Sequence, residues 1–130
     1  MATSSQNNLI VNITRQDANG VTVENRTVGA ISFAGVSGEL DIRQAPDTSQ
    51  HTLDVPTPIV LQFYFRNLSP TANFTIVGTP QGGASVTLAV LPPGAAYIVW
   101  NPVTSGAAGY TTLKYTSDTS GAPFEMFLGG

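Results

Sequence analysis

Short segments in which apolar and polar residues alternate recur along the whole chain, and Gly, Pro or Asn separates each segment from the next. Alternation with a period of two is typical of strands with one buried face. Turn signals at intervals of about 8–12 residues are typical of β-sandwiches. The pattern therefore predicts an all-β fold, namely an antiparallel β-sandwich of about eight to ten strands with a jelly-roll or an Ig-like topology.

The composition supports the same fold class. Ser and Thr together account for 26 residues and Gly and Pro for 22, whereas there are only one Lys and three Glu. Thr favours a half-buried pleated surface, while Gly and Pro supply turns and break helices. No internal repeat or linker is visible. We therefore expect a flexible N-terminal arm at residues 1–8 and a single sandwich domain at residues 9–130.

Three segments give the clearest local predictions. Residues 9–14 alternate and lead into an Asp-Ala-Asn-Gly turn at 17–20. An Asn-Gly pair is a strong hairpin signal because both residues tolerate positive φ. Residues 59–66 are apolar on nearly both faces, which places this strand near the centre of a sheet. Residues 44–58, which contain three prolines, form the longest predicted loop.

The alternation also predicts which apolar side chains face the core. This set comprises Leu9, Val11, Ile13, Ile31, Phe33, Leu61, Phe63, Phe65, Phe74, Ile76, Val86, Leu88, Val90, Ile98, Trp100, Leu113, Tyr115 and Phe127. Burial of a large apolar side chain contributes roughly 1.5–3 kcal/mol, so such a core offsets backbone ordering without disulfides.

Charge and residue types narrow the possible partners. Acidic residues outnumber basic ones by 8 to 5, so the chain lacks the Lys and Arg cluster that a nucleic-acid partner requires. No apolar run approaches the roughly 20 residues that span a bilayer, so we expect no membrane partner. Residues 1–8 show no secretory signal pattern. Because there is no Cys and a single His, we expect no metal ion and no cofactor.

Few residues are candidates for catalysis. His51 is the one base available to a Ser–His–acid triad, but it lies in a polar loop without a Gly-framed nucleophile, so we interpret it as a solvated loop residue. Glu39 and Asp41, with Asp47 and Asp54 nearby in sequence, form a candidate set for glycoside hydrolysis or calcium binding. Their other interpretation is the charged face of an edge strand. We expect no enzymatic activity.

Two aromatic residues are candidate contacts for a ligand or partner. Trp100 ends the predicted strand at 96–100, and Tyr110 begins the next one at 110–116. Such rings stack on sugars or fill a partner's pocket, although packing in the core or at its rim is the other interpretation. A carbohydrate-binding or receptor-binding module is therefore the alternative function.

The C-terminal half combines a Pro-Pro-Gly turn with short strands rich in aromatic residues. Its segments are LPPG at 91–94, YIVWNP at 97–102, YTTLKY at 110–115 and FEMFLGG at 124–130. In these segments the chain resembles small accessory proteins of tailed-bacteriophage particles, which are short, Cys-free β-sandwiches. The resemblance implies a non-enzymatic capsid decoration, head-fibre or tail-accessory protein located in the virion. It also implies major capsid or tail subunits as partners.

Self-association is the remaining expectation. Only 10% of the residues are charged, and a surface with few charges loses little when it is desolvated at an interface. We therefore expect a homo-oligomer, and the resemblance to phage accessory proteins implies a trimer.

Overall fold

The computed structural model describes residues 5–35, 38–53, 62–100 and 109–129, with side chains at 10–26, 41–53, 62–99 and 109–128. The described residues contain strands and no helix. The strands are β1 (Ser5–Gln16), β2 (Thr22–Gly35), β3 (Gly38–Gln44), β4 (His51–Thr52), β5 (Gln62–Asn67), β6 (Phe74–Pro80), β7 (Val86–Leu91), β8 (Ala96–Trp100), β9 (Tyr110–Ser117) and β10 (Pro123–Gly129).

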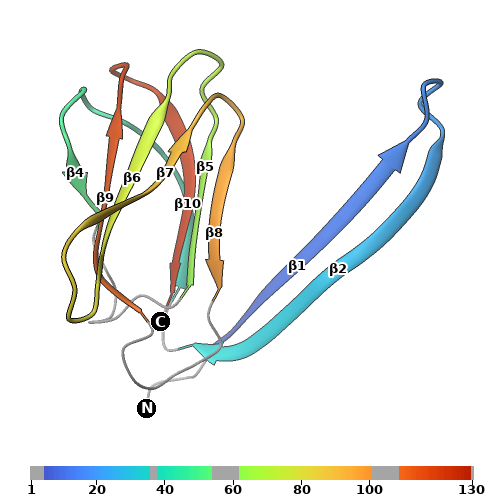
Figure 1. Ribbon diagram of the computed structural model, residues 1–130, viewed down its shortest axis with the longest axis horizontal. Helices are drawn as coiled ribbons and strands as arrows, with labels where there is room; N and C mark the ends of the chain where they lie inside the picture. The colour runs from blue at the N-terminus through green and yellow to red at the C-terminus, as the bar shows by residue number, and fades with distance from the viewer. Residues whose placement is uncertain (1–4, 36–37, 54–61, 101–108, 130) are drawn as a thin grey trace.

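Eight of these strands form two four-stranded antiparallel sheets that face each other (Figure 1). The strand order is β3-β10-β5-β8 in one sheet and β4-β9-β6-β7 in the other. From β3 to β10 the chain crosses between the sheets at every connection except the β6–β7 hairpin. This connectivity is that of a jelly roll. The predicted antiparallel sandwich is confirmed, and the strand order selects the jelly roll over the Ig-like topology.

Two local predictions have different outcomes. Strand β5 lies between β10 and β8, so the predicted central position is confirmed for Gln62–Asn67; residues 59–61 lie outside the described residues. The predicted loop at 44–58 is wrong at His51–Thr52, which pairs with Lys114 and Tyr115 of β9. Pro46, the proline of this segment that the structure describes, lies before the short strand and removes no backbone amide from the pairing.

The core lies between the two sheets and is built around aromatic rings. Phe65 stacks on Phe124 at 4.8 Å between ring centroids and meets Phe74 at 5.3 Å, while Tyr115 packs 4.7 Å from Phe124. Burial is confirmed for six of the predicted core residues: Phe63, Phe65, Phe74, Ile76, Leu113 and Tyr115. The prediction missed a further group of buried apolar residues: Ala45, Leu53, Ala72, Leu91, Ala122, Phe124, Met126 and Leu128.

Several predicted core residues face outward. Val86, Val90 and Ile98 are exposed and Phe127 is only partly buried, whereas Leu88, which is also partly buried, packs against the core as predicted. Both faces of β8 are apolar, and in β10 large apolar residues follow one another at 126–128, so alternation identifies the strand without identifying its inward face. In β8 it is Tyr97 and Val99 that pack against the core.

In β7 a register shift in the pairing with β6 separates Leu88, which packs against the core, from Val90, which is exposed. The shift lies between Ile76 and Val77. Such an irregularity changes which residues of the strand face the core. Leu9, Ile31, Phe33 and Trp100 lie in strands whose side chains are not described at these positions, and Leu61 lies outside the described residues.

Strands β1 and β2 form a separate two-stranded sheet, which we call the hairpin. Figure 1 shows it projecting from the sandwich as a long twisted ribbon. Residues 5–8, expected in a terminal arm, belong to β1 and pair with residues 32–35. Ile13 is 55% exposed and Val11 is partly buried, so the prediction that Ile13 belongs to the core is wrong. Alternation identifies a two-faced strand but not whether a second layer covers it.

The turn of the hairpin differs from the one the Asn-Gly pair predicts. The Gly20 amide donates to the Asp17 carbonyl at 3.0 Å, and only Gly20 takes a positive φ, of 80°. The Asp17 carboxylate accepts from the amides of Asn19 and Val21 at 2.9 and 3.0 Å. The loop is therefore a type I turn followed by a left-handed Gly, the usual three-residue hairpin loop.

Candidate functional site

Four of the eight large exposed apolar residues in the described part of the chain lie on the hairpin. Ile10 is 63% exposed, Val21 60%, Ile13 55% and Val23 52%. Exposed apolar surface on a monomer marks an interaction site where it is contiguous, so the hairpin is the candidate interaction element. Strand alternation was the available signal in this region, and for Ile13 it pointed to a core and not to an interaction surface.

The register of the hairpin separates two chemically different faces. Directly opposed positions of an antiparallel pair share a face. On one face positions 9, 11 and 13 are Leu, Val and Ile, and they oppose Ile31, Gly29 and Arg26. On the other face positions 8, 12 and 14 are Asn, Asn and Thr, and they oppose Ser32, Thr27 and Asn25. Ile10 is the exception on this polar face. The hairpin is therefore amphipathic along the half nearer the sandwich.

The apolar face becomes charged toward the turn. Ile13, Arg15, Glu24 and Arg26 line one shallow hollow. Arg15 and Glu24 lie 3.9 Å apart with exposed side chains, which makes a weak ion pair. With Asp17, the hairpin carries two positive and two negative side chains, so its net charge is zero.

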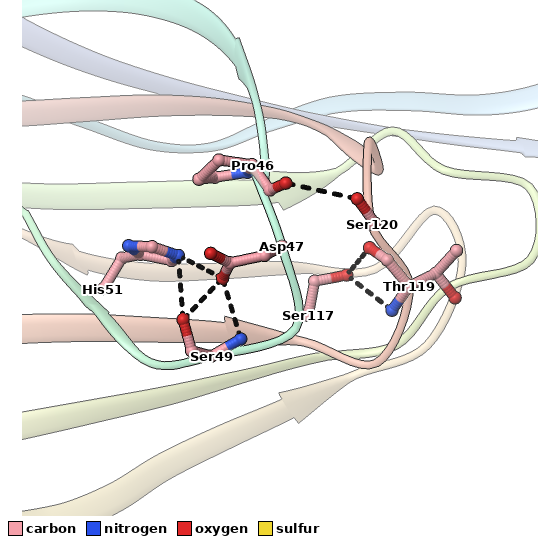
Figure 2. A network of polar contacts seen from close by, with 7 residues as sticks. All are labelled: Pro46, Asp47, Ser49, His51, Ser117, Thr119 and Ser120. Atoms are coloured by element: carbon pink, nitrogen blue, oxygen red, sulfur yellow. Dashed lines mark hydrogen bonds and ion pairs between the residues drawn. The ribbon is translucent and has the colours of Figure 1, made fainter.

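A second polar cluster lies in the loop between β3 and β4 (Figure 2). One carboxylate oxygen of Asp47 accepts hydrogen bonds from the Ser49 amide at 2.9 Å and from the Ser49 hydroxyl, and lies 2.7 Å from His51 Nε2. The Ser49 hydroxyl and amide, followed by His51, lower the pKa of Asp47 to about 2. The loop is thus held around an ionised Asp47.

These three residues do not form a catalytic triad. Ser49 Oγ and Asp47 both approach the same nitrogen of His51, at 3.4 and 2.7 Å. A triad needs the carboxylate on one ring nitrogen and the nucleophile on the other. The His51 ring also packs 5.6 Å from the ring of Tyr115. The arrangement therefore anchors the loop on the sandwich.

The two candidate carboxylates whose side chains are described, Asp41 and Asp47, bind different partners and do not share one. Asp41 accepts from Arg43 Nε at 2.7 Å, and this bond is the main cause of its lowered pKa. Asp41 lies in β3, the outermost strand of its sheet, opposite buried Met126 of β10. A charge in this position discourages further strands from pairing with the sheet edge. The side chains of Glu39 and Asp54 lie outside those described. Among described residues, no three His, Asp or Glu side chains gather as a metal site would require.

The two aromatic candidates lie in strands of different sheets, Trp100 in β8 and Tyr110 in β9. Tyr110 is partly buried and packs against the core beside Gly78. Its neighbour Tyr97 has a raised pKa, first because of burial and then because of Tyr110. Trp100 pairs through its backbone with Gln62, and its side chain is outside those described. A contact of either residue with a ligand or partner stays a prediction.

The outer face of the β3-β10-β5-β8 sheet adds a smaller apolar surface. Ile42 is 65% exposed and Ile98 43% exposed, and between their strands the Tyr64 hydroxyl donates to Glu125 at 2.8 Å. The alternation of Ile42 with Asp41 and Arg43 was a signal for this surface. In that strand the apolar residue points outward and the charged pair lies toward the rim of the core.

Comparisons with known proteins return no relatives. No family model matches the chain, and neither the curated proteins nor the solved structures include a match. Across the residues that the structure describes, no helix is long and apolar enough to cross a membrane.

Proposed function

We propose that the chain is a non-enzymatic structural protein of a virus particle, a capsid decoration or head or tail accessory protein that docks on the particle surface and self-associates. Its partners in this proposal are major capsid or tail subunits, and its location is the virion. The observation that carries the proposal is the projecting hairpin, whose exposed residue Ile10 is available to a partner beyond the jelly roll.

Two further features support this role. Viral capsid domains are among the proteins that use the jelly roll, so the strand order favours the proposal by analogy of fold. The sandwich is held by an aromatic core without any disulfide. A scaffold of this kind keeps its shape while an attached arm binds neighbouring subunits.

Co-sedimentation with assembled particles of the virus that encodes the chain tests the proposal. The purified chain is expected to move with the particles in a density gradient at a fixed ratio to the major capsid or tail protein. Replacing Ile10 by Asp, which puts a charge on the hairpin, is expected to weaken this binding, whereas Val90→Asp on β7 of the sandwich serves as the matched control. A chain that stays at the top of the gradient contradicts the proposal.

The alternative, a carbohydrate-binding or receptor-binding module, gives a different result. The chain has a single Trp, so sugar binding near Trp100 would change its fluorescence without interference from another Trp. Jelly rolls also occur in lectins. A saturable fluorescence change with a glycan, together with no particle binding, would favour this alternative.

A further inference from the structure

The hairpin lacks two kinds of contact at once. Among the described strands, β1 and β2 pair only with each other, so each has one edge with no neighbouring strand. The face that carries Val11 and Ile13 has no second layer among those strands, and Ile13 is 55% exposed. Two-stranded hairpins are marginally stable in water unless a further strand or layer covers them. We therefore expect that a ribbon with strands of 12 and 14 residues is stabilised by contact with a partner.

We propose that the missing partner is the hairpin of further copies of this chain. Around a rotation axis parallel to the strands, β1 of one copy pairs with β2 of the next, and the face of Val11 and Ile13 turns toward the axis. This inference rests on the proposed function, in which the chain self-associates, and names the element through which the copies meet.

Strand direction is compatible with this arrangement. β1 and β2 run antiparallel within the hairpin. Rotation about an axis parallel to the strands keeps every β1 in one direction and every β2 in the other. Each new contact between β1 and β2 is therefore also antiparallel, and the ring closes without leaving an open edge.

Geometry selects three copies as the smallest closed ring. Two ribbons stacked on their apolar faces lie about 10 Å apart, which is too far for their edges to form hydrogen bonds. Three ribbons arranged as the sides of a prism bring each edge beside the next and enclose the apolar face of each copy. A single foreign partner lying on the hairpin covers the face but leaves the edges open.

Charge and area agree with self-association. Arg15, Glu24 and Arg26 lie on the enclosed face toward the turn, and together with Asp17 of the turn they give each hairpin a net charge of zero, so identical hairpins do not repel one another through net charge. A ribbon of this length is about 40 Å long and about 10 Å wide, which gives a face of about 400 Å² per copy. Three such faces exceed the total of about 1,000 Å² that specific interfaces bury.

Light scattering on the full chain tests the stoichiometry. The wild type is expected at three times the 13.6 kDa of one chain. Ile13→Asp places a charge on the enclosed face and is expected to give the monomer mass, whereas Thr14→Asp, on the opposite face of β1, keeps the wild-type mass. Circular dichroism of each variant verifies that the sandwich is folded. A wild type that is monomeric or dimeric, or an Ile13→Asp variant with the wild-type mass, overturns the inference.

Cross-linking tests which face lies inside. The chain has no Cys, so a single introduced thiol reacts without competition. Val11→Cys brings equivalent thiols together at the axis and is expected to give a disulfide-linked pair under mild oxidation. Asn12→Cys, on the other face, is expected to stay unlinked. The opposite pattern, or no linked species in either variant, contradicts the arrangement.

These outcomes separate the inference from the proposed function. A trimer held by the hairpin that fails to sediment with particles retains the inference and rejects the virion role. A chain that sediments with particles but whose mass is insensitive to Ile13→Asp retains the virion role and rejects the hairpin contact.

Discussion

The sandwich and the hairpin are built from the same kind of alternating strand, but they differ in whether the apolar face of that strand is covered. In the sandwich, each sheet covers the apolar face of the other, and residues such as Phe65 and Phe74 are fully buried. In the hairpin, Ile13 alternates with polar residues as Phe65 does, yet more than half of its surface is exposed. The difference shows that alternation creates an apolar face, while topology decides whether the chain covers it by itself.

The two regions also differ in how their polar groups are satisfied. The Asn67 side chain is buried in the sandwich, where its amide donates to the carbonyls of Ala72 and Leu91 at 2.7 and 3.1 Å and its carbonyl accepts from the Ser69 amide at 2.9 Å. The Arg15–Glu24 pair of the hairpin is exposed at 3.9 Å. Buried polar contacts specify one structure, whereas exposed pairs contribute little.

The largest expected effect is the loss of core packing in the sandwich. Phe65→Ala removes a fully buried ring that contacts Phe124 and Phe74, and we expect a loss of about 3–5 kcal/mol in the free energy of unfolding. Urea denaturation followed by circular dichroism measures it. Ile42→Ala, at an exposed site of β3, is the control and should change stability by less than about 1 kcal/mol. Equal losses would mean that the core is not where the structure places it.

The next effect concerns the buried amide of Asn67. Asn67→Ala leaves the carbonyls of Ala72 and Leu91 and the amide of Ser69 without these partners. Buried groups left unpaired cost about 1–3 kcal/mol each, and we expect a total loss of about 2–4 kcal/mol in unfolding free energy. Asn73→Ala, which removes an exposed contact with Asp118, should cost under about 1 kcal/mol. Similar values for both variants would show that burial does not decide the effect.

One substitution made in both regions compares them directly. Gly121 in the β9–β10 turn and Gly20 in the hairpin turn both have positive φ, of 79° and 80°. An L-residue in this conformation costs about 1–2 kcal/mol. Gly121→Ala should therefore lower the unfolding free energy of the sandwich by that amount, while Gly20→Ala should leave its thermal transition unchanged and increase amide exchange in the hairpin. A matched fall in the sandwich transition for both variants would show that the two regions unfold together.

The smallest effect is the pH dependence of the β3–β4 loop. The pKa of Asp47 is lowered from 3.8 to about 2 because the folded loop favours its ionised form. Its stabilising contribution is therefore complete above pH 3.8 and is lost as the pH falls through about 2. NMR titration of the carboxyl carbon should give a midpoint well below the ordinary value. Ser49→Ala should raise that midpoint; an unchanged midpoint would reject the hydrogen bonds as the cause.

Local signals in the sequence predicted much of the sandwich and less of its pairing. Residues 62–67 were recognisable as a central strand because both faces are rich in large side chains. The inward face of β8 was not, because Tyr97 and Ile98 are both large and apolar. The short strand at His51–Thr52 also escaped prediction because its partner, β9, lies far along the chain. Local patterns carry no information about such a distant pairing.

The candidate surface was predictable only in part. The turn at 17–20 identified the hairpin, and alternation identified the apolar face that includes Ile13. Neither signal distinguishes a strand covered by its own chain from one left for a partner, because the period of two is the same in both. Ile13 is exposed because the two sheets of the sandwich are formed by β3 to β10 and do not include β1. Which strands join the sheets is a property of the whole fold.

Hydrogen exchange across the hairpin tests the central claim most directly. In the wild type at assembling concentration, we expect slow exchange at amides on both edges of β1 and β2, because each edge is paired with a neighbouring copy. In Ile13→Asp, the amides of residues 5–16 and 22–35 should exchange rapidly while those of β5 and β10 stay protected. Identical, rapid exchange of the hairpin amides in both proteins would contradict the claim that this ribbon is completed by its own copies.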